Sequence, residues 1–205
     1  DYFPFTLESE FEIRKKKKVL FSEDELWIIQ HKYIHALRDL ERKASAHLNL
    51  SPEKLMIGRF GVGKVFYSHP FESGDYKNMQ SETDCIYHSP AMFKSIIHGD
   101  APIHNPEKSD IFSVGQILLQ LATQKNSKSI YNSENGELDF TEIETRIEAV
   151  KERFSPKFLG NLRSMLNENE SNRPTIDSLM NNNPIHDGDL FTYIDWVIYK
   201  EENTK

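Results

Sequence analysis

The sequence predicts a mainly α-helical fold. In several long segments, apolar residues recur at three- and four-residue spacing, which is typical of amphipathic helices that share a core. Val65-Phe66-Tyr67, followed by Ser68-His69-Pro70, departs from this pattern and suggests an extended turn. The chain has 205 residues, of which 38% are hydrophobic, and this is enough for one domain with a substantial core.

Composition also limits the classes of function. The net charge of −7 argues against nonspecific nucleic-acid binding. No run of about 18 apolar residues occurs, so we expect no membrane span. The single cysteine, Cys85, fits a reducing compartment, and we expect a cytoplasmic protein, with a cytoskeletal location as an alternative. Because the chain begins with Asp1 rather than methionine, we expect it to be a portion of a longer or processed protein.

The first helix is expected to run from Phe5 to Lys18. It ends in the cationic run Arg14-Lys15-Lys16-Lys17-Lys18, and positive charge is favourable near a helix C-terminus. A solvated helix end is the simpler interpretation of this run. The alternative is that Arg14, Lys15, Lys16 and Lys17 contact an acidic partner.

A second, longer helix is expected to follow. Ser22 and Glu25 have the spacing of a capping box, with Ser22 as the N-cap and Glu25 at the third helical position. Apolar residues then recur at helical spacing and predict a stripe that faces the core, namely Leu26, Ile29, Tyr33, Ala36, Leu37 and Leu40.

The segment after this helix contains the most informative motifs of the chain. It reads Ala46-His47-Leu48-Asn49-Leu50-Ser51-Pro52-Glu53-Lys54-Leu55-Met56-Ile57-Gly58-Arg59-Phe60-Gly61. A loop rich in Ser, Gly, Asp, Asn and His comes next, and it leads to Tyr87-His88-Ser89-Pro90-Ala91.

The remaining helices follow this loop. Lys108-Ser109-Asp110-Ile111-Phe112-Ser113-Val114-Gly115-Gln116-Ile117-Leu118 is apolar nearly all round, which predicts a helix at the centre of the domain. Further amphipathic helices are expected over 142–153 and 158–166, and Asn172-Arg173-Pro174-Thr175 comes after them.

In order and spacing, these motifs resemble the carboxy-terminal lobe of eukaryotic protein kinases. Residues 46–61 resemble the catalytic His-Arg-Asp, Leu-Lys-Pro-Glu-Asn and Asp-Phe-Gly motifs, and 87–91 stand where the family has Ala-Pro-Glu. The resemblance covers residues 1–182, with a hinge-like start at 1–4 and an activation-like loop at 62–91. It implies a protein-kinase-like helical bundle with a small β-hairpin around the degenerate catalytic segment.

Within this resemblance, four functional positions are replaced. Asn49 stands for the catalytic Asp, Lys54 for the metal-binding Asn, Arg59 for the Asp of Asp-Phe-Gly, and Ala91 for the Glu of Ala-Pro-Glu. An amide cannot act as a general base at ordinary pH, and magnesium requires oxygen ligands rather than cationic donors. We therefore expect a pseudokinase with no enzymatic activity.

Six positions keep the residues that the family uses for architecture: His47, Phe60, Gly61, Asp110, Gly115 and Arg173. The resemblance implies that Asp110 holds the backbone of the catalytic-like segment. It also implies that Arg173 has lost its carboxylate partner, because Ala91 occupies that position. A buried Arg without an acceptor is costly, so Arg173 is expected either to find another carboxylate or carbonyl, or to lie in a solvated region.

Residues 183–205 depart from the family and form an aromatic tail. Phe191, Tyr193 and Trp196 either pack on the same lobe or dock into a partner, since large aromatic side chains are favoured at interfaces. Among the eight histidines we identify no pair with metal-ligand spacing, and we expect neither a metal site nor a cofactor.

The leading functional hypothesis is a catalytically inactive scaffold that binds other proteins within a larger assembly, without nucleic-acid partners. One alternative is a nucleotide-sensing pseudokinase, in which Lys54 and Arg59 neutralise phosphates in place of the metal. The other alternative is a weakly active atypical kinase with relocated catalytic groups.

Overall fold

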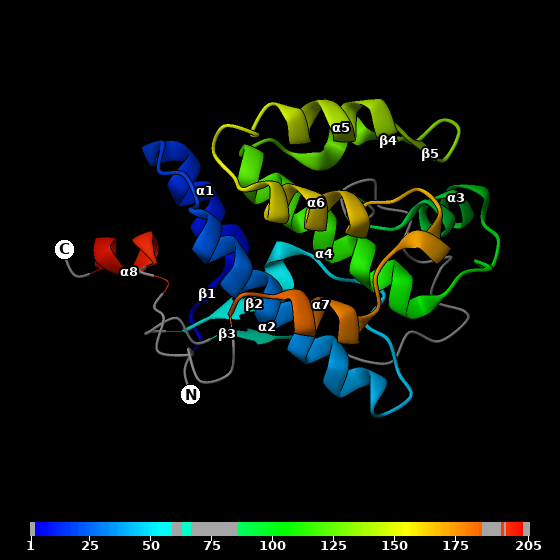
Figure 1. Cartoon of the computed structure of the whole chain (residues 1–205), viewed down its shortest axis with the longest axis horizontal. Helices are drawn as coiled ribbons and strands as arrows, with labels where there is room; N and C mark the ends of the chain where they lie inside the picture. Colours follow the sequence, from blue (N-terminus) through cyan, green and yellow to red (C-terminus); the bar gives the residue numbers. More distant parts are fainter. Residues whose placement is uncertain (1–2, 59–62, 67–85, 186–193, 195, 203–205) are drawn as a thin grey trace.

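The computed structural model describes residues 3–58, 63–66, 86–185, 194 and 196–202. In this part of the chain the prediction of a mainly helical fold is confirmed, and the strands form two small antiparallel sheets (Figure 1). The elements in chain order are β1 (Phe5–Thr6), α1 (Leu7–Lys17), α2 (Glu23–Glu41), β2 (Leu55–Ile57), β3 (Gly63–Val65), α3 (Pro90–His98), α4 (Pro106–Thr123), β4 (Tyr131–Asn132), β5 (Glu137–Leu138), α5 (Phe140–Glu148), α6 (Pro156–Met165), α7 (Ile176–Asn182) and α8 (Val197–Glu202).

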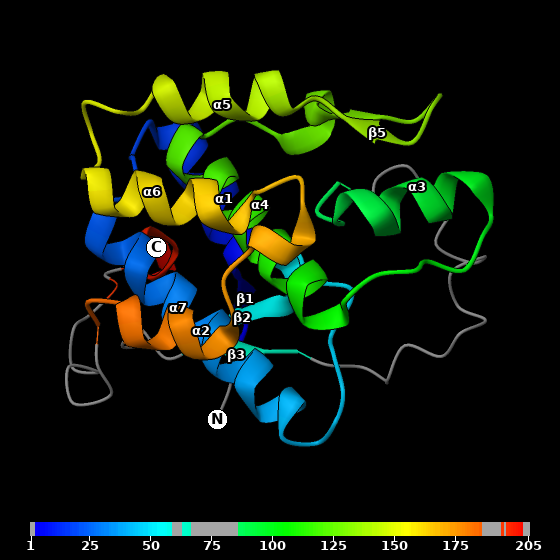
Figure 2. The same ribbon diagram turned by 45° about the vertical axis from the view of Figure 1, so that its right-hand side comes forward.

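Helix α4 runs through the middle of the molecule, as its apolar sequence predicts. It packs against α2 on one side and against α5 and α6 on the other (Figures 1 and 2). Gly115 permits a close approach to α6, because a Cβ atom at this position would lie 3.0 Å from two side-chain carbon atoms of Leu166. Gly115 therefore has a packing role at the centre of the core.

The helix starts are explained by local capping. Ser22 and Glu25 form the predicted capping box at the start of α2. Helix α1 begins at Leu7, two residues later than predicted, because Thr6 caps it and Phe5 belongs to β1. Helix α5 is shifted toward the N-terminus relative to the predicted range 142–153, because the side chain of Asp139 caps it at Phe140.

A three-stranded antiparallel sheet, ordered β1-β2-β3, lies beside α1 and α2. The predicted hairpin is formed by β2 and β3, with Leu55 opposite Val65. Strand β1 extends this hairpin, with Phe5 opposite Ile57, and this pairing was not predicted because two residues give no periodicity to detect. A second small pair, β4 with β5, precedes α5.

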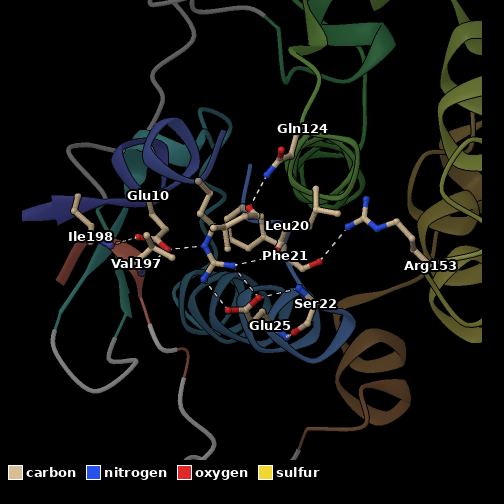
Figure 3. Close-up of polar contacts among 11 residues, drawn as sticks. Glu10, Leu20, Phe21, Ser22, Glu25, Gln124, Arg153, Val197 and Ile198 are labelled. Carbon is tan, nitrogen blue, oxygen red and sulfur yellow. Dashed lines mark hydrogen bonds and ion pairs between the residues drawn. The ribbon is translucent and has the colours of Figure 1, made fainter. Parts of the chain in front are cut away.

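The described part of the tail packs on the same body rather than projecting from it. Ile194, Trp196 and Ile198 are buried in the common hydrophobic core, and α8 packs against α1. The carboxylate of Glu10 accepts hydrogen bonds from the backbone N–H groups of Val197 and Ile198, both at 2.9 Å (Figure 3). Glu10 therefore satisfies free donors at the start of α8.

Among the described helices, none combines the length and the apolar character that a membrane crossing requires.

Candidate functional site

The candidate site is built around residues 46–58, which we name the anchored segment. Asp110 lies in the second turn of α4 and is 1% exposed. One of its carboxylate oxygens accepts the backbone N–H of His47 and the other accepts that of Leu48, each at 2.7 Å. The contact expected between Asp110 and this backbone is therefore present.

The anchor holds the backbone in an unfavourable conformation. Leu48 has a φ of 55°, in the left-handed region that costs a non-glycine residue about 1–2 kcal/mol. Burial raises the pKa of Asp110 to about 7, although the two backbone N–H groups act in the opposite direction by stabilising the carboxylate. The anchor is thus a buried polar group whose function in the fold is to fix the course of residues 47–48.

His47 ties the anchored segment to the residue that follows β3. Its Nδ1 accepts the backbone N–H of Asn49 at 3.3 Å, and its Nε2 lies 2.9 Å from the carbonyl oxygen of Phe66. These two contacts assign the proton to Nε2, which donates to Phe66. Burial lowers the pKa of His47, in keeping with a neutral imidazole that serves as a structural link.

The anchored segment and α1 both line a hollow of about 480 Å³. Asn49, Glu53 and Lys54 contribute from the segment, and the charged residues from α1 are Glu8, Glu12 and Lys15. The structure therefore brings Asn49 and Lys54 to the same hollow, as the resemblance implies. Arg59, Phe60 and Gly61 lie outside the described residues.

Glu8 is a residue of this hollow that the sequence reasoning missed. Its pKa is raised to about 7, first by burial and then by the neighbouring carboxylates of Glu12 and Glu53. Its Oε2 atom is buried and has no hydrogen-bond partner among the described residues. The available signal was the spacing of Glu8, Glu12 and Lys15, which places them on one face of α1.

The charges around the hollow limit its chemistry. Three carboxylates and two ammonium groups line it, an arrangement that favours a cationic or neutral polar group over a polyphosphate. In the described part of the chain, no group of three or more His, Cys, Asp or Glu side chains is placed to hold a metal ion. The ammonium group of Lys54 lies 6.0 Å from the centre of the Phe66 ring, at the range of a cation–π contact.

Arg173 is buried and donates to backbone carbonyl groups. Of the two alternatives left open by the sequence, another acceptor or a solvated region, the structure therefore shows the first. The guanidinium of Arg173 donates to the carbonyl oxygens of Asn167 at 2.7 Å, Glu168 at 3.0 Å and Lys108 at 3.2 Å. It also lies 4.8 Å from the centre of the Phe112 ring. Burial lowers the pKa of Arg173 to about 10, so it remains charged at neutral pH and connects α4 to the loop after α6. Ala91 lies half-buried in the first turn of α3.

Two of the predicted partner contacts are wrong, because their side chains are buried. Arg14 is 2% exposed and forms ion pairs with Glu10 at 2.6 Å and with Glu25 at 2.7 Å (Figure 3). Its guanidinium also lies over the ring of Phe21. Trp196 is 3% exposed and belongs to the core.

The other predicted partner contacts remain predictions. Lys15, Lys16 and Lys17 are exposed at the end of α1, as expected for a solvated cationic surface. Phe191 and Tyr193 lie outside the described residues.

A pair of histidines on α2 was also missed. His31 and His35 are one helical turn apart, and their ring centres are 4.0 Å from each other with an angle of 33° between the ring planes. The spacing His-x-x-x-His inside a predicted helix was the signal that could have revealed them.

No model of a known protein family matches this chain, and no curated protein matches it significantly. The function is therefore inferred from the residues and geometry of the site.

Proposed function

We propose that this chain is a catalytically inactive, protein-kinase-like carboxy-terminal lobe that acts as a structural and protein-interaction scaffold within a larger assembly. The observation that carries this proposal is the contrast within the anchored segment. Asp110 and His47 fix its backbone through buried hydrogen bonds, whereas Asn49 and Lys54 stand at the positions that would handle the proton and the metal.

The replaced side chains oppose phosphoryl transfer on chemical grounds. Transfer requires a carboxylate that accepts the proton of the substrate hydroxyl and oxygen ligands that hold magnesium. The amide of Asn49 is neutral and the ammonium of Lys54 repels a cation. The buried contacts of Asp110 and His47 are kept although the catalytic and metal-binding side chains are replaced. This combination supports a role in folding and binding rather than in catalysis.

Two exposed features support protein binding. Lys15, Lys16 and Lys17 form a cationic surface at the end of α1, and the apolar side chains of Val19 and Leu20 beside it are 38% and 50% exposed. Such a surface suits a partner that offers acidic and apolar groups. We place this scaffold in the cytoplasm or on the cytoskeleton, since its lone Cys85 suits a reducing compartment.

Residual kinase activity is a second candidate, and Glu8 is the observation that favours it. Its pKa of about 7 would suit a general base, and it lines the same hollow as Asn49. A relocated base does not replace the missing metal ligands, so we rank this candidate below the scaffold. If it is right, the substitution Glu8→Gln abolishes a measurable phosphotransfer activity.

Thermal denaturation with nucleotide separates the scaffold from nucleotide sensing. The native protein is heated with ATP alone, with ATP and Mg²⁺, and with ATP and EDTA. We expect no change in Tm under any of these conditions. A rise in Tm that persists in EDTA would favour metal-independent nucleotide binding through Lys54, and Lys54→Ala would then remove it. A rise that requires Mg²⁺ would contradict the proposed loss of the metal site.

A further inference from the structure

We infer that the turn between α1 and α2 is the docking site for a protein segment in which apolar side chains are flanked by carboxylates. This inference rests on the proposed scaffold function and specifies the chemistry of one of its partners. The site consists of residues 15–20 at the end of α1, together with Lys125 and Arg153. We name it the cationic turn.

The backbone of the cationic turn is held in place by hydrogen bonds from three side chains (Figure 3). The amide of Gln124, at the end of α4, donates to the carbonyl oxygen of Val19 at 2.8 Å. The guanidinium of Arg14 donates to the carbonyl oxygen of Leu20 at 3.3 Å, and Arg153 donates to that of the next residue at 3.3 Å. The turn is therefore a fixed part of the surface, tied to elements that are distant in sequence.

Two neighbouring apolar side chains are exposed on this fixed turn. In the described part of the chain, four large apolar side chains are exposed, and Val19 and Leu20 are the only two of them that are adjacent. The next residue, Phe21, is buried, and its ring centre lies 4.2 Å from the guanidinium carbon of Arg14. Because the backbone is held and Phe21 fills the inner side of the turn, removing Val19 and Leu20 from water requires a partner.

The charge around these two side chains is positive. Residues 15–25, 122–126 and 151–154 carry seven cationic and four acidic side chains, a formal charge of +3, whereas the whole chain has −7. Two of the four carboxylates are already engaged, since Glu25 is held in an ion pair and Glu23 accepts hydrogen bonds from the start of α6. The region is therefore complementary to an acidic segment.

The distribution of charge favours a protein segment over a lipid surface. A bilayer with anionic headgroups faces a large part of the molecule, and the net charge of −7 opposes its approach. A peptide segment contacts the cationic turn alone. Two apolar side chains surrounded by cationic groups also have the arrangement of a small protein interface, with an apolar centre and a polar rim.

Fluorescence anisotropy with the native protein tests this inference. The probe is a fluorescein-labelled peptide with Leu-Leu at its centre and Asp and Glu residues on both sides. One control peptide has Ser-Ser at its centre, and the other has Lys in place of the acidic residues. We expect saturable binding of the probe that weakens as NaCl is raised from about 50 mM to about 300 mM, and at least about tenfold weaker binding of both control peptides.

Charge-reversal variants assign the binding to the cationic turn. Lys16→Glu combined with Lys125→Glu should weaken binding of the probe at least about tenfold, because it reverses two charges beside the apolar pair. Lys43→Glu combined with Lys94→Glu is the matched control, since it changes the net charge equally at exposed positions after α2 and on α3. This control should bind the probe like the native protein.

A second pair of variants tests the apolar contact. Leu20→Ser should weaken binding of the probe at least about threefold, because it removes an apolar side chain that the probe buries. Ile103→Ser is the matched control, since Ile103 is 97% exposed in the segment before α4, and it should leave binding unchanged. All of these positions are exposed, and circular dichroism of each variant establishes that it is folded.

Loss of probe binding in both variants of the cationic turn, with retention in both controls, supports the site. Absence of saturable binding to the native protein, or equal losses in the controls, overturns it. Sedimentation with vesicles of phosphatidylcholine and phosphatidylserine distinguishes a lipid surface, and binding to these vesicles without binding to the probe also overturns the inference. The scaffold proposal is judged separately by thermal denaturation with ATP, so it stands if Tm is unchanged by ATP and the probe fails to bind.

Discussion

The anchor formed by Asp110 leads to a prediction that can be worked out in free energy. Replacing Asp110 by Asn keeps the shape of the side chain but leaves one acceptor oxygen in place of two. One of the two backbone N–H groups that Asp110 accepts, those of His47 and Leu48, then faces an NH₂ group. A buried donor left without an acceptor costs about 1–3 kcal/mol, so we expect Asp110→Asn to lower the free energy of unfolding by about 2 kcal/mol at pH 8, where the carboxyl is ionised and both of its oxygens are acceptors.

The pH dependence of this difference has a defined sign. The pKa of Asp110 is raised to about 7 in the folded chain from an ordinary value of 3.8. A carboxyl group with a raised folded-state pKa contributes stability that is fully present at low pH and is lost as the pH rises through about 7. The native chain therefore loses part of this contribution between pH 6 and pH 8, while the neutral amide of the variant does not titrate. The difference between the two proteins should shrink by about 1 kcal/mol over this interval.

Urea unfolding followed by tryptophan fluorescence measures the loss of unfolding free energy in the variant and its change with pH. Hydrogen exchange of the His47 and Leu48 amides shows whether the destabilisation arises at these two donors. Asp139→Asn is the matched control, because Asp139 is an exposed helix N-cap, a position where Asn and Asp are nearly equivalent. The reasoning is refuted if Asp110→Asn changes the free energy of unfolding by less than about 0.5 kcal/mol and leaves the exchange of both amides unaltered.

Three further predictions concern stability. Glu8→Gln should reduce the fall in the free energy of unfolding between about pH 5 and pH 8, because ionisation of the native Glu8 carboxyl, with its pKa raised to about 7, destabilises the folded state. Urea titrations at several pH values measure this pH dependence, and the same dependence in both proteins would contradict the prediction. Arg14→Leu should cost about 3–5 kcal/mol in urea unfolding, because it leaves the buried carboxylate of Glu10 without its ion pair, and a loss below about 1 kcal/mol would show that the pair contributes little. Gly115→Ala should lower Tm because the added methyl group would lie 3.0 Å from the side chain of Leu166, the C-cap of α6. Gly160→Ala, with open space around it, should raise Tm slightly, and equal effects of the two substitutions would contradict the packing role of Gly115.

The parts of the fold that could be predicted from sequence depend on local signals. The capping box of Ser22 and Glu25 and the buried character of α4 each follow from a few neighbouring residues. The hairpin of β2 and β3 was expected from the resemblance rather than from a local signal. The link between Asp110 and residues 47–48 spans more than sixty positions, and it was predicted only through a resemblance that relates distant motifs.

The missed features depend on contacts between residues that are distant in sequence. Arg14 was grouped with four exposed lysines because nothing local distinguishes it, yet its partner Glu25 lies across the turn between α1 and α2. Trp196 could not be placed, since its burial depends on the docking of the tail against α1, where Glu10 binds amides 187 and 188 positions away. The burial of Glu8 likewise requires the anchored segment to face α1.

The replaced residues of the anchored segment could be predicted from sequence, whereas the residues that other elements place around them could not. Asn49 and Lys54 define by their chemistry what the anchored segment cannot do, and this follows from residue identity alone. The presence of three carboxylates in the same hollow depends on how α1 is placed, and it became evident only in three dimensions.

A phosphotransfer assay of the native protein with labelled ATP and Mg²⁺ tests the proposed loss of catalysis most directly. The scaffold proposal predicts no transfer to a generic protein substrate or to the chain itself above the level of a heat-denatured sample, and no difference between the native protein and Asn49→Ala. Magnesium-dependent transfer that disappears in Asn49→Ala or Lys54→Ala would contradict it.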